Sequence, residues 1–195
     1  PSMLVWMKQM CFEDGRVTCF NDSATNIASA PADIISYAKR LGFYDKDIPI
    51  AKGVQYKHLA DTGYISITRD DLKLVLDVAN LGPDYLLAHA HADTLSFELS
   101  VNTQRIIVNS GTSCYGSGAR RGFERSTRAH NTVEIDDCSS SEVWSTFRVA
   151  RRARPFGLII DNSEERLSGE CSHDGYTRLT GAPVHTRNWM IGPEK

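Results

Sequence analysis

The chain has 195 residues, of which 41% are hydrophobic and 24% are charged, and its formal net charge is −2. This is the composition of a globular protein with one or two domains and enough apolar residues to bury a core. Because the charges nearly balance, no field of one sign draws the whole chain to nucleic acid or to a membrane surface. No apolar run approaches the length of a membrane span either. We therefore expect neither nucleic acid nor a membrane as a partner.

Five cysteines are scattered along the chain, at positions 11, 19, 114, 138 and 171. Their number is odd and no two of them form a C-x-x-C pair, so the sequence predicts neither a disulfide framework nor a cysteine zinc site. We expect buried or incidental thiols.

The N-terminal part of the chain predicts two short helices. Residues 3–12 are apolar enough for a helix that ends near Gly15, because glycine often terminates helices. A second helix is expected to begin at Pro31 and to end before Gly42, since apolar residues recur between them at helical spacing.

After about residue 53 the apolar pattern changes to short β-rich runs. Residues 64–68 and 72–78 are two such runs split by a polar turn, which indicates a hairpin, and residues 95–101 and 105–110 flank a turn at Asn102. Further strands are expected over residues 131–136, 145–160, 176–181 and 185–191. The predicted fold class is therefore mainly β: an antiparallel β-sandwich with a short N-terminal helical segment.

A loop rich in arginine and glycine is expected over residues 111–128, GTSCYGSGARRGFERSTR. Long loops in folded domains are usually functional or disordered. Guanidinium groups bind carboxylates and sulfates at two points, so this arginine loop suits an anionic substrate. The alternative is a solvated loop whose arginines pair with nearby Asp and Glu side chains. Its arginines are Arg120, Arg121, Arg125 and Arg128.

The sequence HAHAD at residues 89–93 is the strongest candidate for a functional site. If it forms a strand, then His89, His91 and Asp93 point to one face of the sheet. Burying three such groups without partners is costly, so they need a metal, a polar network or a water-filled cleft. H-x-H on a strand is a recurrent metal-ligand geometry. The alternative is that these histidines are satisfied core residues.

A third imidazole follows the arginine loop, because His130 is expected at the start of the next strand. It would complete a three-ligand set with His91, and the strand over residues 105–110 offers Asn109 or Ser110 nearby. The alternative is that His130 and the asparagine after it only cap a turn.

Several motifs, in their order along the chain, resemble those of the heparinase II/III-like polysaccharide lyases. The motifs are HAHADTLSFEL, IIVNSGTSCYG, RRGFERSTRAHNTVEID, SEVWSTFRVARRA, HDGYTRL and HTRNWMI, within residues 55–191. That family joins a helical toroid to a C-terminal antiparallel β-sandwich, and DGRVTCFNDSA is similar to the end of the toroid. The resemblance therefore implies the tail of a helical domain over residues 1–52 and a β-sandwich domain over residues 53–195.

The resemblance implies cleavage of acidic, uronic-acid-containing polysaccharides by β-elimination. His89 matches a family histidine at the active site, which neutralises the uronate carboxylate or assists proton transfer. The family's catalytic tyrosine comes from the toroid, and Tyr115 is a candidate in this chain only through its place in the arginine loop. Arg125 and Arg128 of that loop are candidates for binding the anionic sugar.

The resemblance also implies a zinc site, with His91 and His130 as ligands. The family's third ligand is an aspartate in a VDPGT-like stretch, whereas this chain reads VNSGT and has Asn109 there. An amide oxygen is an uncharged and weaker ligand for zinc than a carboxylate. The alternative to zinc is a His–Asn–His network that contains no ion.

Three functions follow from these patterns. The first is a fragment of a polysaccharide lyase, inactive alone without its helical domain because the general base is missing. The second is a non-catalytic carbohydrate-binding or structural β-sandwich of the same family. The third is a cupin-like metal enzyme, disfavoured by the missing glutamate and glycine pattern. Periplasmic or secreted location in bacteria is implied by the resemblance alone, and a homodimer is one option for the oligomeric state.

Overall fold

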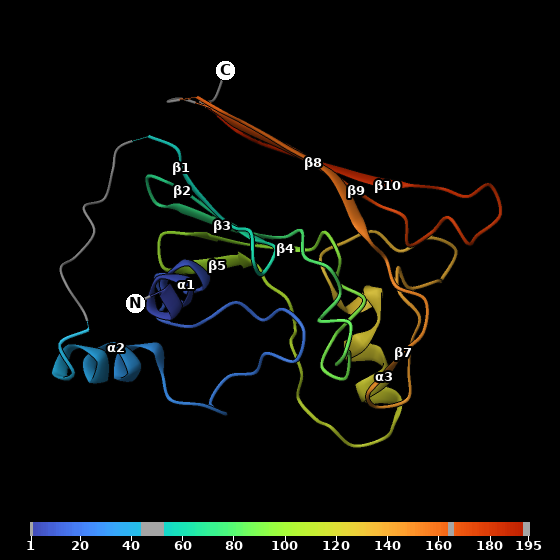
Figure 1. Ribbon diagram of the computed structural model, residues 1–195, viewed down its shortest axis with the longest axis horizontal. Helices are drawn as coiled ribbons and strands as arrows, with labels where there is room; N and C mark the ends of the chain where they lie inside the picture. The colour runs from blue at the N-terminus through green and yellow to red at the C-terminus, as the bar shows by residue number, and fades with distance from the viewer. Residues whose placement is uncertain (1, 44–52, 164–165, 193–195) are drawn as a thin grey trace.

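A five-stranded antiparallel sheet forms the centre of the molecule (Figure 1). The computed structural model describes residues 2–43, 53–163 and 166–192. The five strands are hydrogen-bonded to one another in chain order. They are β1 (Gln55–Leu59), β2 (Tyr64–Arg69), β3 (Leu72–Asp77), β4 (Phe97–Val101) and β5 (Gln104–Ile107).

A three-stranded antiparallel sheet, in the order β10-β9-β8, lies above the first sheet in Figure 1. Its strands are β8 (Pro155–Asn162), β9 (Leu167–His173) and β10 (His185–Ile191). A separate short hairpin pairs β6 (Val143–Trp144) with β7 (Arg148–Val149). The helices are α1 (Ser2–Met10), α2 (Pro31–Arg40), α3 (Ala119–Arg125) and the 3-10 helix η1 (Thr127–Ala129). Within the described ranges, none of the helices has the length and apolar character needed to cross a bilayer.

The hydrophobic core lies between the two sheets. Side chains alternate between the two faces of a strand, so Ile65 and Ile67 of β2 share a face with their partners Leu76 and Leu74 of β3. These four residues pack against the second sheet. The buried residues of the second sheet in this core are Leu167, Cys171, Trp189 and Ile191. Full burial of such a side chain contributes about 1.5–3 kcal/mol, so this contact holds the sheets together.

The opposite face of the five-stranded sheet is more polar and is covered by the N-terminal segment. Lys73 Nζ donates hydrogen bonds to the carbonyl oxygens of Lys8 and Cys11 where α1 ends. Glu98 accepts a hydrogen bond of 2.6 Å from the backbone N–H of Cys19. These contacts hold the segment after α1 against the sheet and direct it towards the HAHAD loop.

The predicted fold class is confirmed, as are the two N-terminal helices, the hairpin over residues 64–78 and the last strand, residues 185–191. Strand β9 (Leu167–His173) was not anticipated. The division into domains at residue 52 stays a prediction, and residues 44–52 lie outside the described part of the chain.

Several expectations of local structure are wrong, and the strand expected over residues 145–160 is divided between β7 and β8. HAHAD is an irregular loop instead of a strand, and residues 176–181 form turns. Part of the arginine loop is helix α3, where helix-forming residues and an i,i+4 ion pair between Arg120 and Glu124 favour the helix. His130 starts no strand, because it directly follows η1 and donates its backbone N–H to the carbonyl oxygen of Thr127. Residues 131–136 contribute only an isolated bridge at Ile135.

Candidate functional site

The HAHAD loop is held by backbone contacts to the α3–η1 segment. Arg125 donates through Nε and Nη2 to the carbonyl oxygen of Ala90, at 3.1 and 3.0 Å, and Thr127 Oγ1 donates to that of Ala92, at 2.7 Å. The backbone N–H of Ala92 in turn donates to the carbonyl oxygen of Arg125 at 2.9 Å. The loop is irregular because its backbone groups bond to this segment instead of to a neighbouring strand. Both alanines are buried, and their small size allows the close approach.

A carboxylate from the N-terminal segment, Asp22, joins both histidines of the loop. Its Oδ2 lies 2.8 Å from His89 Nδ1 and its Oδ1 lies 2.7 Å from His91 Nε2. Arg121 of α3 adds a two-point ion pair, with Nη2 2.9 Å from Oδ2 and Nη1 bonded to Oδ1. Asp22 therefore connects three parts of the chain that are distant in sequence.

The charge of Asp22 is stabilised by these partners. Burial alone raises the pKa of its carboxyl group, but hydrogen bonds from His91, Arg121 and His89 outweigh burial and hold this pKa well below its ordinary value. The side chains of Asp22 and Arg121 are 6% and 1% exposed, so solvent screens their ion pair little. Removing either partner leaves a buried charge without compensation.

The row of contacts continues from His91 to His130 and Asn109. His91 Nδ1 lies 3.2 Å from His130 Nε2, and His130 Nδ1 lies 3.1 Å from Asn109 Oδ1. All three side chains are buried. Burial lowers the pKa of His130, against the opposing effect of the Asp93 charge. The three residues proposed from sequence as metal ligands therefore meet in one connected row that begins at Asp22.

His89 differs from the other two histidines because its side chain is 59% exposed. Its Nδ1 faces Asp22, so its Nε2 is the ring nitrogen available to a ligand. The rings of Tyr115 and Phe147 lie 5.8 and 6.0 Å from the His89 ring. The structure thus places Tyr115 beside His89. These are the two residues proposed for catalysis from the sequence.

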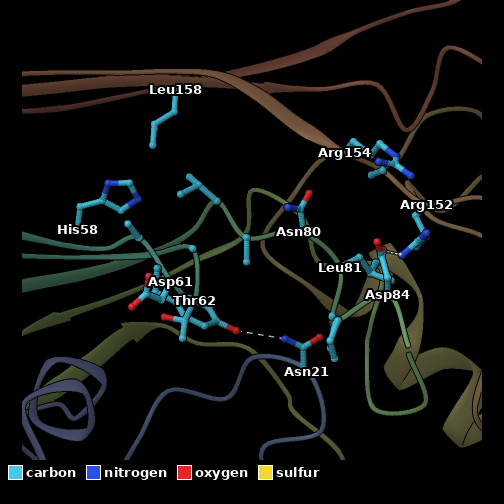
Figure 2. Close-up of a pocket in the computed structure, with 18 residues that line it drawn as sticks. Asn21, His58, Asp61, Thr62, Asn80, Leu81, Asp84, Arg152, Arg154 and Leu158 are labelled. Carbon is cyan, nitrogen blue, oxygen red and sulfur yellow. Dashed lines mark hydrogen bonds and ion pairs between the residues drawn. The ribbon is translucent and has the colours of Figure 1, made fainter. Parts of the chain in front are cut away.

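A cleft of about 630 Å³ adjoins this site (Figure 2). Asn21, which precedes Asp22, lines the cleft, where its Nδ2 donates to the Tyr64 hydroxyl at 3.3 Å. Its Oδ1 accepts a hydrogen bond of 3.1 Å from the backbone N–H of His91. His89, His91 and His130 are not among the residues that line the cleft. Asn21 therefore links the cleft wall to the histidine loop.

A sequence profile described as "Heparinase II/III-like, C-terminal" matches residues 51–195, most of the chain. The chain belongs to the heparinase II/III-like family. No curated protein sequence matches it.

Solved structures of heparinase-like enzymes share the fold of this chain. A mutant of the heparan sulfate lyase HepC from Pedobacter heparinus superposes with a TM-score of 0.68 at 17% identity, over 97% of this chain and 30% of that chain. The heparinase III that is the BT4657 gene product gives a TM-score of 0.71 at 16% identity, over 96% of this chain and 29% of that chain. At these identities the likeness concerns the fold. The chain spans about 30% of the length of these structures.

The zinc set implied by the heparinase resemblance is incomplete here. Nδ1 of His91 and Nε2 of His130 are 3.2 Å apart, close to the spacing of about 3.3 Å between two nitrogens of a tetrahedral zinc site. However, Asn109 lies against the other ring nitrogen of His130 and carries no charge. Across residues 2–43, 53–163 and 166–192, no three His, Cys, Asp or Glu side chains are grouped to hold a metal. The residues present do not fit a three-ligand zinc site.

The two arginines proposed for substrate binding are engaged by the protein itself. Arg125 is buried and also donates to the carbonyl oxygens of Trp144 and Ser145, at 3.4 and 3.2 Å. Arg128 is exposed and donates through Nε and Nη2 to Glu134, at 2.9 and 2.8 Å. Both guanidinium groups hold loops in this structure, and their binding of substrate stays a prediction.

Sequence reasoning missed Asp22 and the specific role of Arg121. Asp22 lies 67 residues before His89, in a stretch of polar turn formers that shows no catalytic pattern. The only signal was the resemblance of DGRVTCFNDSA, which contains Asp22, to the end of the family's helical part. Arg121 belongs to the arginine loop, but nothing in its spacing separates it from the other three arginines.

Proposed function

We propose that this chain forms the β-sandwich part of a polysaccharide lyase that cleaves uronic-acid-containing glycans by β-elimination. The observation that carries the proposal is the Asp22–His89 pair, in which the carboxylate lies 2.8 Å from Nδ1 while the ring is 59% exposed. A carboxylate on one imidazole nitrogen fixes the tautomer and the orientation of the other nitrogen. The likeness to heparan sulfate lyases makes heparan sulfate the first substrate to test.

In the proposed reaction, a base removes the proton on the carbon next to the uronate carboxylate. The electron pair forms a carbon–carbon double bond, and the 4-linked sugar oxygen departs and takes up a proton. The Nε2 of His89 has two roles open to it: to neutralise the carboxylate as imidazolium, or to transfer a proton as imidazole. Tyr115 is the proposed proton-transfer partner in this chain, since its ring lies 5.8 Å from that of His89.

The second proton-transfer group is proposed to come from a helical domain like that of the family's lyases. We therefore expect the 195-residue chain alone to be inactive, because base and charge neutraliser must meet on one carbon. Loss of one positioned acid or base costs about 100- to 10,000-fold in rate.

The test is the ultraviolet absorbance of the unsaturated uronate product. Uronate polymers, heparan sulfate first, would be incubated with a protein that joins this chain to a helical domain. His89→Ala should lower the rate by about 100- to 10,000-fold. The control is Met190→Ala, an exposed side chain on β10 away from the cleft, which should leave the rate unchanged. A joined protein that binds these polymers but never yields the absorbing product would contradict the proposal.

A second candidate function is a non-catalytic carbohydrate-binding sandwich. The amide of Asn109 favours it, because an uncharged group lies against His130 at the position where the resemblance implies a carboxylate. Binding of uronate oligosaccharides without product, in the joined protein, is the result that this candidate predicts.

A further inference from the structure

Two half-exposed aromatic rings stand beside His89. Phe147, in the turn of the β6–β7 hairpin, is 40% exposed, and Tyr115 of the arginine loop is 47% exposed. Their ring centroids are 5.6 Å apart, and both lie within 6.0 Å of the His89 ring. Large aromatic rings at a surface leave apolar area in water, so a cluster of them beside an open histidine indicates a binding surface.

The cluster of Tyr115, Phe147 and His89, here called the aromatic wall, rests on the guanidinium of Arg121. The Arg121 Cζ atom lies 5.3 Å from the Tyr115 ring centroid and 5.6 Å from that of Phe147. A buried cation beneath aromatic faces fixes them through cation–π attraction. The same guanidinium is paired to Asp22, which also contacts His89, so Arg121 supports all three residues of the wall.

The hairpin that carries Phe147 is also fixed from below. Arg121 Nε donates to the carbonyl oxygen of Thr146 at 3.2 Å, and Arg125 donates to those of Trp144 and Ser145. Three consecutive carbonyl groups of the turn are therefore held by two buried arginines. A ring held in this way loses little conformational entropy when a ligand packs on it, which favours binding.

We propose that the aromatic wall is a stacking subsite for one pyranose ring of an acidic glycan, next to the uronate whose carboxylate faces His89. This inference rests on the proposed function and names the residues that select its substrate. One face of a pyranose ring carries C–H groups that pack on an aromatic ring and remove apolar area from water. The ring's hydroxyl groups stay at the edge, in solvent.

The test measures the affinity of the 195-residue chain for a heparan sulfate hexasaccharide by titration calorimetry. Phe147→Ala and Tyr115→Ala should each weaken binding about tenfold, from the usual worth of an aromatic contact. Tyr115→Phe should retain affinity, because the ring and not the hydroxyl makes the contact. The control Phe156→Ala removes a ring of similar exposure, 49%, from β8 and should change nothing.

A tryptophan reporter covers the case in which Phe147→Ala loosens the hairpin. The chain has three tryptophans of its own, so the emission of each variant is compared with that of the wild-type chain. The difference, which reports the new indole, should shift to shorter wavelength in Phe147→Trp when the hexasaccharide binds, whereas in Phe156→Trp it should not. Unchanged emission in Phe147→Trp, wild-type affinity in both alanine variants, or no binding by the wild-type chain would overturn the subsite. An uncharged glucan hexasaccharide that binds as tightly would overturn its acidic ligand class. Failure of the proposed function is distinct: it would appear as normal binding without unsaturated product in the joined protein.

Discussion

Two buried pairs of histidines lie in this chain, one in the candidate site and one at the end of the second sheet. In the first pair, His91 Nδ1 lies 3.2 Å from His130 Nε2. In the second, His185 Nδ1 lies 3.0 Å from His173 Nε2, across the β9–β10 ladder. The contacts within the pairs are nearly equal, so the difference between them lies in what surrounds each pair.

In the second pair, the remaining ring nitrogen of His173 is hydrogen-bonded to the backbone. The N–H of Gly175 donates to His173 Nδ1 at 3.1 Å, so the ring proton of His173 sits on Nε2 and points to His185. Burial, followed by the His185 charge, lowers the pKa of His173 to about 4. This pair is neutral and structural at physiological pH.

The first pair is instead connected to an ionised carboxylate and, through it, to an open ring. Asp22 bonds His91 and also His89, which is 59% exposed. A buried imidazole pair therefore becomes part of a candidate site when a charged partner couples it to an exposed group.

The largest expected effect comes from removing that carboxylate. Asp22→Asn leaves the buried guanidinium of Arg121 without its counter-charge, and breaking such a pair costs about 3–5 kcal/mol in the free energy of unfolding. Urea denaturation of the variant measures the loss. The matched control is Asp84→Asn, whose exposed ion pair with Arg152 should be worth less than about 1 kcal/mol. Equal small losses in both variants would mean that Asp22 does not hold the site together.

The second prediction concerns the pH dependence of the neutral pair. The ordinary pKa of His173 is 6.5 and its folded value is about 4, so between these pH values the unfolded chain binds a proton that the folded chain does not. The free energy of unfolding should therefore fall as pH is lowered from 6.5 to 4, by on the order of 3 kcal/mol from this group. Denaturation at several pH values measures the slope.

Another group acts in the opposite direction in part of this window. Burial raises the pKa of Glu98 from 4.5 to about 6, so between these pH values the folded chain binds a proton that the unfolded chain does not. This contribution increases the free energy of unfolding as the pH falls. The measurement must therefore compare wild type with His173→Asn, whose Oδ1 replaces Nδ1 as the acceptor for the Gly175 N–H. Identical slopes in both proteins, or an NMR titration of the His173 ring in the folded chain near 6.5, would show that the pair is not held neutral.

The two pairs also show which features of the fold and of the site could be predicted from the sequence. The sandwich and the strand that carries His185 followed from local alternation, which acts over neighbouring residues. HAHAD marked the first pair, but the assumption of a strand was wrong because the Ala90 and Ala92 backbone groups bond to α3 and η1. The role of Asp22 could not be predicted from periodicity, since a contact between residues 67 positions apart leaves no repeating pattern in the sequence. His173 begins the motif HDGYTRL, but nothing in that motif predicts its buried pair with His185, because its other partner is the backbone N–H of Gly175.

Asn109→Asp would give the first pair a second carboxylate. The substitution would place this carboxylate at His130 Nδ1, where Asn109 Oδ1 now lies at 3.1 Å. A carboxylate bonded to one imidazole nitrogen strengthens the other as a metal ligand, so zinc affinity should rise about 10- to 100-fold. Zinc titration with a competing chelator measures this change. The matched control is Asn188→Asp on β10, and an equal gain there would show only non-specific binding to added charge.

The smallest expected effect comes from Asp174→Asn. This variant tests whether a carboxylate near an imidazole has a large effect on stability only when the two are hydrogen-bonded. Asp174 acts on His173 only through its charge, which raises the pKa of that ring slightly against the dominant effect of burial. In Asp174→Asn the side-chain oxygen can still accept the hydrogen bond of 2.7 Å from the Arg154 backbone N–H. The free energy of unfolding at neutral pH should therefore change by less than about 1 kcal/mol.

The pKa of His173 should fall slightly in this variant, because the Asp174 charge that favours the protonated ring is gone. The loss of stability in acid should therefore extend to slightly lower pH. An NMR titration of His173 in this variant measures the shift, and a rise in its pKa would contradict the argument. A large change in either quantity would place Asp174 beside Asp22 as a direct partner and remove the distinction between the two pairs.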